Sequence, residues 1–284
     1  MPVPHFADEH GGPLSITFIG GGNMATALVG GLLARGTPAA SIGVVEPLHE
    51  ARARLSERYG VACFESAAQA DPLGDLVVLA VKPQQAREAC RALRPHVGDR
   101  AVLSVAAGIR IEDISRWVGG TSRIARCMPN TPALIGAGIS GVFARAEVDA
   151  AARGQIQSIL EAVGKVVWVA EEALLDPVTA VSASGPAYVF YFIEALEQAA
   201  DEMGLPADAG AALAIETFRG AAELAARSSE PAATLRGRVT SKGGTTERAL
   251  ASMHSDGVKE AIVRALHAAN RRARELGDEF GKDD

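Results

Sequence analysis

The stretch Ser15-Ile-Thr-Phe-Ile-Gly-Gly-Gly-Asn-Met-Ala25 decides the fold, because it joins a short apolar segment directly to a run of glycines. Residues 15–19 are rich in β-branched side chains and predict a strand. Residues 24–35 carry apolar side chains at helical spacing and end at Gly36, which is typical of a helix with a glycine C-cap. The chain therefore opens with a strand–turn–helix unit.

The turn between these two elements has the pattern G-x-G-x-x-A, formed by Gly20, Gly22 and Ala25. In this pattern the first glycine allows a tight turn, the second lets a pyrophosphate approach the backbone, and the small third residue lets the helix pack closely on the strand. The helix N-terminus then offers unpaired N–H groups to the phosphates. A glycine turn alone needs no ligand, but its position after the first strand favours a dinucleotide site.

Strands and helices alternate over the following part of the chain. Strands are expected at residues 42–45, 61–64, 76–81, 101–105, 123–127, 139–144 and 166–169, and helices at 48–59, 84–93, 111–118 and 148–162. This alternation predicts a doubly wound parallel sheet. The continuous apolar run of residues 76–81 is typical of a strand that is buried on both faces of such a sheet.

The strand signal stops after Trp168, and only helices are expected beyond it, at residues 173–179, 186–203, 206–227, 246–254 and 258–276. The composition shift near Ala170 places a domain boundary there. We therefore expect a flexible tail at 1–14, a dinucleotide-binding domain at 15–170 and a helical domain at 171–284. The fold class is α/β plus all-α, a Rossmann-type sheet domain followed by a helical dimerisation and substrate domain.

Dimerisation is expected because one predicted helix is apolar on nearly every side. The first half of the helix at 186–203 reads Tyr188-Val-Phe-Tyr-Phe-Ile193, and a helix of this kind must be surrounded. A helical domain of this length has little interior to surround it. A partner subunit is expected to supply the rest, so the sequence predicts an obligate dimer or a larger assembly.

Composition limits the function classes. A chain of 284 residues suits two domains, and its formal charge of −6 argues against nucleic acid as a partner. The three cysteines and six histidines show no metal-ligand spacing, so no metal site is expected and the thiols are expected to be reduced. Residues 1–14 lack the features of a signal peptide, and the most apolar stretch, 187–196, is too short to cross a bilayer. We expect a soluble cytoplasmic protein.

Glu46 closes the second strand, where an acidic side chain accepts hydrogen bonds from the ribose hydroxyls of the adenosine. Such a carboxylate repels a 2′-phosphate and favours NAD(H), whereas the nearby His49, Arg52 and Arg54 offset that repulsion. The preference between NADP(H) and NAD(H) stays open at this point. Alternatively, Glu46 is a solvated loop carboxylate.

Residues 239–247, which we call the anion loop, are not explained by a helical architecture. Two glycines stand among four hydroxyl side chains and lead into a helix. Consecutive backbone N–H groups at such a turn bind anions, and the helix dipole favours a carboxylate there. The alternative is a simple N-cap by Thr245 or Thr246, which needs only one hydroxyl. We favour anion binding.

The chain resembles pyrroline-5-carboxylate reductases, which carry the same motifs in the same order. These motifs are Ile19-Gly-Gly-Gly-Asn-Met24, Ala80-Val-Lys-Pro83, Met128-Pro-Asn-Thr-Pro132, Ser184-Gly-Pro-Ala-Tyr188 and Val239-Thr-Ser-Lys-Gly-Gly-Thr-Thr246. The resemblance implies a dinucleotide-binding domain, a helical dimerisation domain, an active site completed across the dimer, and a homo-oligomer built from dimers. It implies NAD(P)H-dependent reduction of 1-pyrroline-5-carboxylate to L-proline, the last step of proline biosynthesis.

The resemblance and the strand-end positions together nominate the site residues. The expected cofactor-binding residues are Ile19, Gly20, Gly21, Gly22, Asn23, Met24, Glu46, Val81, Lys82, Pro83, Ala106 and Ala107. The expected substrate-binding residues are Ser241, Gly243, Gly244, Thr245, Thr246 and Glu171, with the Thr246 hydroxyl as the catalytic partner of the ring nitrogen. Lys242 departs from the commonest family form, which has proline, and Arg238 replaces a polar uncharged residue of some members.

Two other functions are weighed against this one. A β-hydroxyacid dehydrogenase shares the two-domain plan but needs a general base, usually a lysine on a helix of the second domain, and residues 173–227 contain no lysine. A dinucleotide-sensing regulator without turnover would not need the anion loop. Both alternatives are therefore disfavoured.

Overall fold

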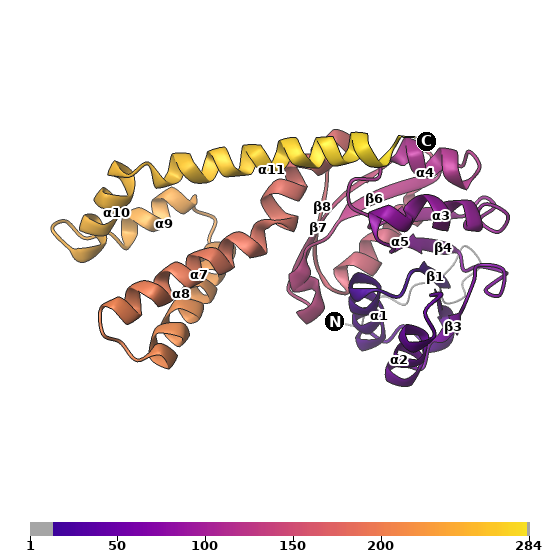
Figure 1. Ribbon diagram of the computed structural model, residues 1–284, viewed down its shortest axis with the longest axis horizontal. Helices are drawn as coiled ribbons and strands as arrows, with labels where there is room; N and C mark the ends of the chain where they lie inside the picture. Colours follow the sequence, from indigo (N-terminus) through magenta and orange to yellow (C-terminus); the bar gives the residue numbers. More distant parts are fainter. Residues whose placement is uncertain (1–13, 283–284) are drawn as a thin grey trace. The chain divides into compact units, whose positions relative to one another are not determined.

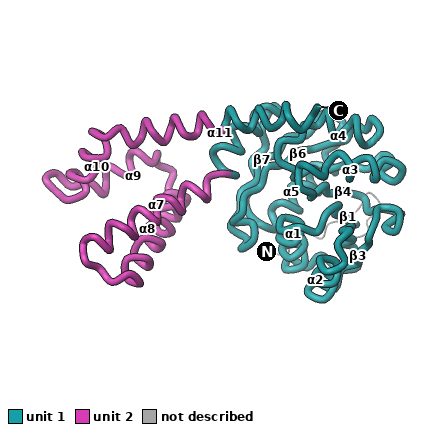
Figure 2. Tube along the Cα trace, in the orientation of Figure 1, with its two compact units in different colours: residues 1–183, 270–284 teal, residues 184–269 magenta. Residues whose placement is uncertain are grey.

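The computed structural model describes residues 14–282, which form two compact units (Figure 2). Unit 2 is residues 184–269, and unit 1 takes the described residues on either side of it. The sequence-based boundary at 170/171 lies earlier, and the last part of the chain was expected in the second domain. The composition shift marks the change from strands to helices, but the first helical residues after it still pack in unit 1, where Leu175 is buried. Residues 1–13 of the expected tail lie outside the described residues, whereas Leu14 is buried.

One eight-stranded sheet organises unit 1 (Figure 1). Its strands are β1 (Ile16–Ile19), β2 (Ile42–Val45), β3 (Ala62–Phe64), β4 (Leu76–Leu79), β5 (Ala101–Ser104), β6 (Ile124–Met128), β7 (Gly138–Ala144) and β8 (Gly164–Trp168). The order is β3-β2-β1-β4-β5-β6-β7-β8, which confirms a Rossmann-type sheet. The sheet is parallel from β3 to β6, whereas β7 pairs antiparallel with β6, and β8 pairs parallel with β7. Only a short 3₁₀ helix, Thr131–Ile135, joins β6 to β7, and parallel strands need a longer crossover.

Helices cover both faces of the sheet. Helices α1 (Asn23–Ala34), α2 (His49–Tyr59) and α5 (Ala150–Glu161) share one hydrophobic cluster with the strands, and α3 (Pro83–Leu93) and α4 (Ile111–Val118) share the other. Strand β4 contributes alternate residues to the two clusters, Leu76 and Val78 to the first and Val77 and Leu79 to the second. This confirms the expectation that the continuous apolar run is buried on both faces.

Unit 2 is helical, as expected. It contains α7 (Gly185–Glu202), α8 (Ala207–Arg227), α9 (Ala232–Arg238), α10 (Thr245–Ser255) and the first part of α11 (Val258–Phe280). Helix α9 was not anticipated, because its seven residues are too few for a clear apolar period. Before unit 2, the short α6 (Leu175–Val178) leads into a π-helical turn at Thr179–Ala183. Helix α11 runs on into unit 1, where Phe280 packs against the cluster of α3 and α4.

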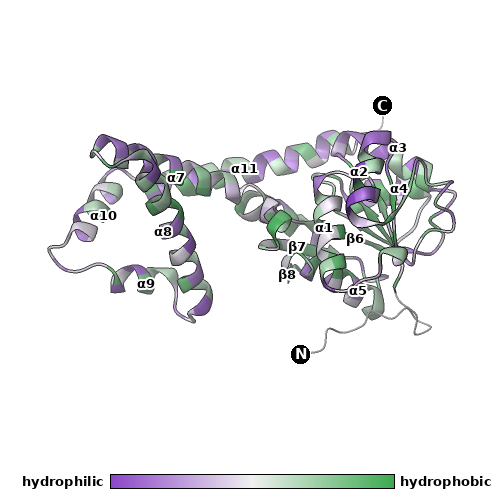
Figure 3. Ribbon diagram, turned by 90° about the horizontal axis from the view of Figure 1, so that it is seen from below, coloured by the Kyte–Doolittle hydropathy of each residue, from purple (hydrophilic) through white to green (hydrophobic). Residues whose placement is uncertain are grey.

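The aromatic half of α7 is open in the single chain. Phe190 is 61% exposed and Tyr191 is 71% exposed, and the neighbouring α8 exposes Leu213, Ile215 and Leu224. Figure 3 colours these helices by hydropathy and shows green stretches along both. An exposed apolar surface of this kind marks an interaction site. The single chain therefore leaves uncovered the helix that the sequence expects to be surrounded.

A buried ion pair fixes the chain where it leaves the sheet. Arg126 on β6 is 8% exposed, and its Nη1 lies 2.5 Å from Glu172 Oε1. The same carboxylate oxygen accepts the backbone N–H of Ile111 at 2.8 Å, at the start of α4. The helix dipole of α4 adds to the attraction. Burial raises the pKa of the neighbouring Asp176 carboxyl, although Arg126 opposes that shift. Glu172 therefore satisfies both a buried guanidinium and a helix N-terminus.

We predict that Glu172→Ala lowers the free energy of unfolding by about 3 kcal/mol, because it leaves the buried Arg126 charge without a counterion. The measurement is urea unfolding followed by circular dichroism. Glu171→Ala is the matched control, since its carboxylate is exposed and it removes the same charge one residue away. Equal stability losses in the two variants would show that the Arg126 ion pair contributes nothing specific.

Candidate active site

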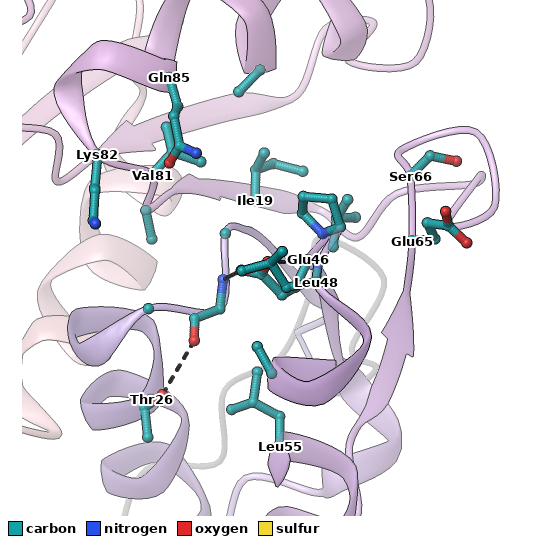
Figure 4. A pocket seen from close by; sticks show the side chains of 18 of the residues that line it. Ile19, Thr26, Glu46, Leu48, Leu55, Glu65, Ser66, Val81, Lys82 and Gln85 are labelled. Atoms are coloured by element: carbon teal, nitrogen blue, oxygen red, sulfur yellow. Dashed lines mark hydrogen bonds between the residues drawn. The ribbon is translucent and has the colours of Figure 1, made fainter. Parts of the chain in front are cut away.

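A cavity of about 1080 Å³ lies where β1, β2, β3 and β4 end (Figure 4). We call it the strand-end cavity, and all of its lining residues belong to unit 1. It sits at the point where the strand order reverses, since β1 pairs with both β2 and β4. In open α/β sheets this is where ligands bind.

The glycine turn that follows β1 forms one wall of the cavity. Gly20 has a φ of 99°, and a Cβ on it would lie 2.7 Å from the carbonyl oxygen of Ala80. Gly22 is different, because a Cβ there would meet nothing within 4 Å. The open space in front of Gly22 is thus not used by protein packing. Gly22 is also the N-cap of α1, and no side chain caps that helix.

These two features fit a bound pyrophosphate. The first N–H groups of a helix have no intrahelical partner, and α1 leaves them without a side-chain acceptor. An anion in the space beside Gly22 would accept hydrogen bonds from them and gain from the helix dipole. The G-x-G-x-x-A pattern therefore has the backbone geometry that the sequence predicts.

Glu46 lies beside the glycine turn and is held by two backbone donors. Its Oε2 accepts the N–H of Gly21 at 2.9 Å, and its Oε1 accepts the N–H of Leu48 at 3.0 Å. Figure 4 shows its side chain pointing at the turn, inside the strand-end cavity. Glu46 is therefore a fixed carboxylate of the cavity wall, and not a solvated loop carboxylate.

Eight of the twelve sequence-predicted cofactor residues line the strand-end cavity, namely Ile19, Gly20, Gly21, Gly22, Asn23, Glu46, Val81 and Lys82. Lys82 is exposed and stands at the N-cap of α3, where Pro83 then begins the helix. Met24, Pro83, Ala106 and Ala107 do not line this cavity. Met24 packs against the hydrophobic cluster of α1, and Ala106 is buried. Their contact with a cofactor stays a prediction.

The strand-end cavity also has lining residues that the sequence analysis missed. They include Thr26, Arg58, Glu65, Ser66 and Gln85, and they join Arg54, which the sequence already names as a cation near Glu46. Glu65 and Ser66 follow β3 directly, so the rule that ligands bind at the carboxyl ends of strands identifies them once β3 is placed next to β2. The arginines lie on α2, a helix whose position over the cavity becomes clear only in the folded chain.

The anion loop in unit 2 leaves the start of α10 without a side-chain cap. Gly244 is the N-cap residue, and neither threonine hydroxyl caps the helix. Gly243 has a φ of 73° and donates its N–H to Glu247 Oε2 at 2.7 Å. Within the described chain the N–H groups of Thr245 and Thr246 have no acceptor. The simple N-cap is therefore not formed, and two unpaired donors sit behind a left-handed glycine.

The remaining predicted substrate residues differ in their surroundings. Ser241 accepts the N–H of Gly244 through its carbonyl oxygen at 3.1 Å, which closes the turn of the anion loop. The Thr246 side chain is exposed. Glu171 is exposed with no side-chain cap at the following 3₁₀ turn, whereas the next residue, Glu172, makes the buried ion pair.

Two other loops that the sequence singles out meet in unit 1. Asn130 donates from Nδ2 to the carbonyl oxygen of Ser182 at 3.4 Å, and its Oδ1 accepts the N–H of Ile139 at 3.0 Å. The motif Met128–Pro132 after β6 is thereby joined to the π-helical turn Thr179–Ala183 that precedes α7. Among residues 14–282 no three His, Cys, Asp or Glu side chains are grouped so that they could hold a metal ion.

Comparison with known proteins identifies the family. Residues 172–276 match the family model for pyrroline-5-carboxylate reductase dimerisation, and residues 15–108 match the model for NADP oxidoreductase, coenzyme F420-dependent. The chain is 43% identical over 268 residues to a pyrroline-5-carboxylate reductase of Pseudomonas aeruginosa, covering 94% of this chain and 98% of that one. It belongs to the pyrroline-5-carboxylate reductase family.

Solved structures agree with that assignment. A pyrroline-5-carboxylate reductase from Coxiella burnetii has a TM-score of 0.89 at 40% identity and covers 93% of this chain and 98% of its own. The crystal structure of Plasmodium falciparum pyrroline carboxylate reductase with NADP bound has a TM-score of 0.82 at 26% identity, with the same coverage of the two chains. A dimerisation domain is thus present in this chain, and it begins close to the boundary expected from the sequence.

The two departures from the pyrroline-5-carboxylate reductase pattern have different surroundings. Arg238 forms an ion pair with Glu230, with 2.5 Å between Nη1 and Oε2. Its charge is thus already compensated by its neighbour. Lys242 is exposed in the anion loop.

We predict that Gly22→Ala keeps the fold but weakens dinucleotide binding roughly tenfold or more, because its methyl group fills the space in front of the α1 N-terminus. The measurements are the melting temperature and the Kd for the reduced dinucleotide by fluorescence titration. Gly20→Ala is the comparison and should instead lower the melting temperature, because its φ is positive and its Cβ meets the Ala80 carbonyl. Tight binding by a folded Gly22→Ala protein would contradict the assignment of this space to a pyrophosphate.

Proposed function

We propose that this chain is a pyrroline-5-carboxylate reductase, which reduces 1-pyrroline-5-carboxylate to L-proline with NADPH or NADH. The observation that carries the proposal is a pair of open helix N-termini: open space lies in front of Gly22 in the strand-end cavity, and the N–H groups that follow Gly244 in the anion loop have no acceptor within the described chain. The first suits a pyrophosphate and the second a small carboxylate. Family membership supports the same reaction.

The proposed chemistry asks little acid–base work of the protein. A cyclic imine is electrophilic once its nitrogen is protonated, so the enzyme need not supply a strong acid. When bound, the reduced nicotinamide supplies the hydride for the imine carbon. The described residues bind and orient the reactants, and positioning of this kind contributes a large part of the rate.

Each group has a proposed task. The N–H groups that follow Gly22 hold the pyrophosphate, and Glu46 accepts from the ribose hydroxyls. The unpaired N–H groups of Thr245 and Thr246 hold the substrate carboxylate, while the Thr246 hydroxyl orients the ring nitrogen and then the amine of the product. Glu171 and Ser241 are further proposed substrate contacts. The further proposed cofactor contacts are Met24, Pro83, Ala106 and Ala107.

The general base that a β-hydroxyacid dehydrogenase needs is not found on α7 or α8. Neither α7 nor α8 carries a lysine, and the exposed Lys242 stands in a loop. A general base for alcohol oxidation must lie within hydrogen-bond reach of the substrate hydroxyl, usually from a fixed element. The imine reduction needs no such group and is the better match.

We further propose that the protein is a homo-oligomer built from dimers and that it works in the cytoplasm. The exposed aromatic side chains of α7 and the dimerisation model over residues 172–276 support the first point. The three cysteines are free thiols, which is usual in a reducing compartment and supports the second. Within residues 14–282, none of the helices combines the length and apolar character needed to cross a membrane.

We predict that Thr246→Ala lowers kcat/KM by about ten- to a thousandfold, because the ring nitrogen loses its orienting hydroxyl. The measurement is oxidation of the reduced dinucleotide with pyrroline-5-carboxylate as the second substrate. Thr246→Ser is the matched control and should keep most of the activity, since it retains the hydroxyl. An unchanged kcat/KM in the alanine variant would exclude the proposed role of this side chain.

We predict that the wild type sediments as a dimer or larger species at micromolar concentration and that Phe190→Lys shifts it toward smaller species. A charge on the exposed aromatic surface of α7 must be desolvated when that surface is covered. Ala146→Lys, an exposed position of unit 1, adds the same charge and should leave the distribution unchanged. A monomeric wild type in sedimentation equilibrium would contradict the proposed assembly.

A further inference from the structure

We propose that this chain selects NADH over NADPH and that Glu46 is the residue that makes the selection. The inference rests on the proposed function only in that it takes the strand-end cavity as the dinucleotide site. It goes beyond that function by naming which of two cofactors the described residues accept. One carboxylate fixed in the cavity wall and the contacts of the neighbouring cations determine this selection.

The Glu46 carboxylate cannot turn away from an incoming cofactor. Both of its oxygens accept backbone N–H groups, from Gly21 at 2.9 Å and from Leu48 at 3.0 Å. Its stem also packs against the turn, because a Cβ placed on Gly21 would lie 3.3 Å from Glu46 Cβ. Rotation of the side chain away from the cavity would leave two backbone donors unpaired, which is costly. The charge therefore stays where it is.

A carboxylate in this position has acceptor capacity left for hydroxyl groups. An ionised carboxylate offers about four lone-pair sites, and the two backbone N–H groups occupy two of them. The remaining sites can accept from the 2′- and 3′-hydroxyls of an adenosine ribose. A 2′-phosphate offers further acceptors and about two negative charges, so it cannot form these hydrogen bonds with Glu46.

Arg52 cannot reverse the preference for NADH, because its guanidinium already donates hydrogen bonds to other groups of the protein. Arg52 donates from Nη1 to the carbonyl oxygens of Glu46 and Pro47, each at 2.7 Å. Its Nη2 lies 3.7 Å from the Glu65 carboxylate. Arg52 does not line the strand-end cavity, and neither does His49. Of the three cations near Glu46 in the sequence, Arg52 and His49 are therefore not available to a 2′-phosphate, which leaves Arg54.

The charge balance of the strand-end cavity points the same way. Its acidic lining residues are Glu46, Glu57, Glu65 and Glu88, and its basic lining residues are Arg54, Arg58 and Lys82. The guanidinium carbon of Arg58 already lies 5.1 Å from the centre of the Tyr59 ring. Arg54, Arg58 and Lys82 are the lining cations available to a 2′-phosphate, and each would have to act against the fixed Glu46. Like charges placed together in a binding site weaken binding strongly.

The test is a binding titration without substrate. The Kd values of NADH and NADPH are measured by fluorescence for the wild type, Glu46→Ser, Glu46→Gln and the control Glu50→Ser. We expect the wild type to bind NADH about ten- to a hundredfold more tightly than NADPH. Glu46→Ser should reverse or abolish that ratio, because it removes the charge and frees the Gly21 and Leu48 N–H groups as donors for a phosphate. Glu50→Ser removes an equal charge outside the cavity and should keep the wild-type ratio.

The ratio of the two Kd values separates selection from a structural role. If Glu46 only stabilised the turn, its substitution would weaken both dinucleotides equally, and that result would overturn the proposal. A wild type that binds NADPH as tightly as NADH would also overturn it. Glu46→Gln keeps the shape of the side chain, so it provides the same test if Glu46→Ser fails to fold. A protein that binds NADH selectively but does not oxidise it with pyrroline-5-carboxylate would contradict the proposed function and leave this inference standing.

Discussion

The close approach of Gly20 to the end of β4 is the constraint on which the rest of the site depends. Gly20 donates its N–H to the carbonyl oxygen of Val45 at 2.7 Å, while a Cβ on Gly20 would lie 2.7 Å from the carbonyl oxygen of Ala80. Only a residue without a side chain can turn the backbone between two neighbouring strands at this distance. The turn directs the start of α1 over the sheet edge, so its N–H groups face the strand-end cavity.

Strand register then brings the other residues to the same place. Ile19 pairs with Val45 on one side and with Leu79 on the other, so the residues that follow these three strands emerge at one level. Glu46 and Ala80 meet the glycine turn for this reason. The cavity wall is built largely from backbone and from one anchored carboxylate. Its geometry is consequently determined by strand pairing more than by the conformations of long side chains.

Local pattern was sufficient for the parts of this protein that depend on neighbours in sequence. The apolar runs predict the strands, and the glycine pattern with its preceding strand predicts the strand–turn–helix unit of β1 and α1. The antiparallel β7 could not be read in the same way, because strand direction depends on where the chain goes after the short turn at Thr131–Ile135. The partner of Arg126 was equally hidden, because Glu172 lies far along the sequence and nothing near either residue indicates the other.

Some site residues can be predicted from neighbours in the sequence, and others depend on tertiary packing. Gly20, Gly22 and Glu46 follow from a local pattern, and the structure places them together in the strand-end cavity. Arg58 does not, because which side of α2 faces the cavity depends on how that helix packs on the sheet. The compact unit of residues 184–269 begins later than the domain boundary expected at 170/171, and the reason is tertiary. The chain turns helical after Trp168 while it is still packed in unit 1.

The two anion sites of the proposal are built in the same way, although they lie in different units and have unrelated sequences. In each, a glutamate carboxylate accepts the N–H of a glycine just before a helix, Glu46 from Gly21 and Glu247 from Gly243. In each, the next glycine is the N-cap and no side chain caps the helix. A glycine N-cap lowers helix stability by roughly a few tenths of a kcal/mol relative to serine or aspartate, so each of these helix starts carries a small cost. The glutamate recovers part of it by fixing the turn without covering the first helical donors, which therefore remain open to an anionic ligand.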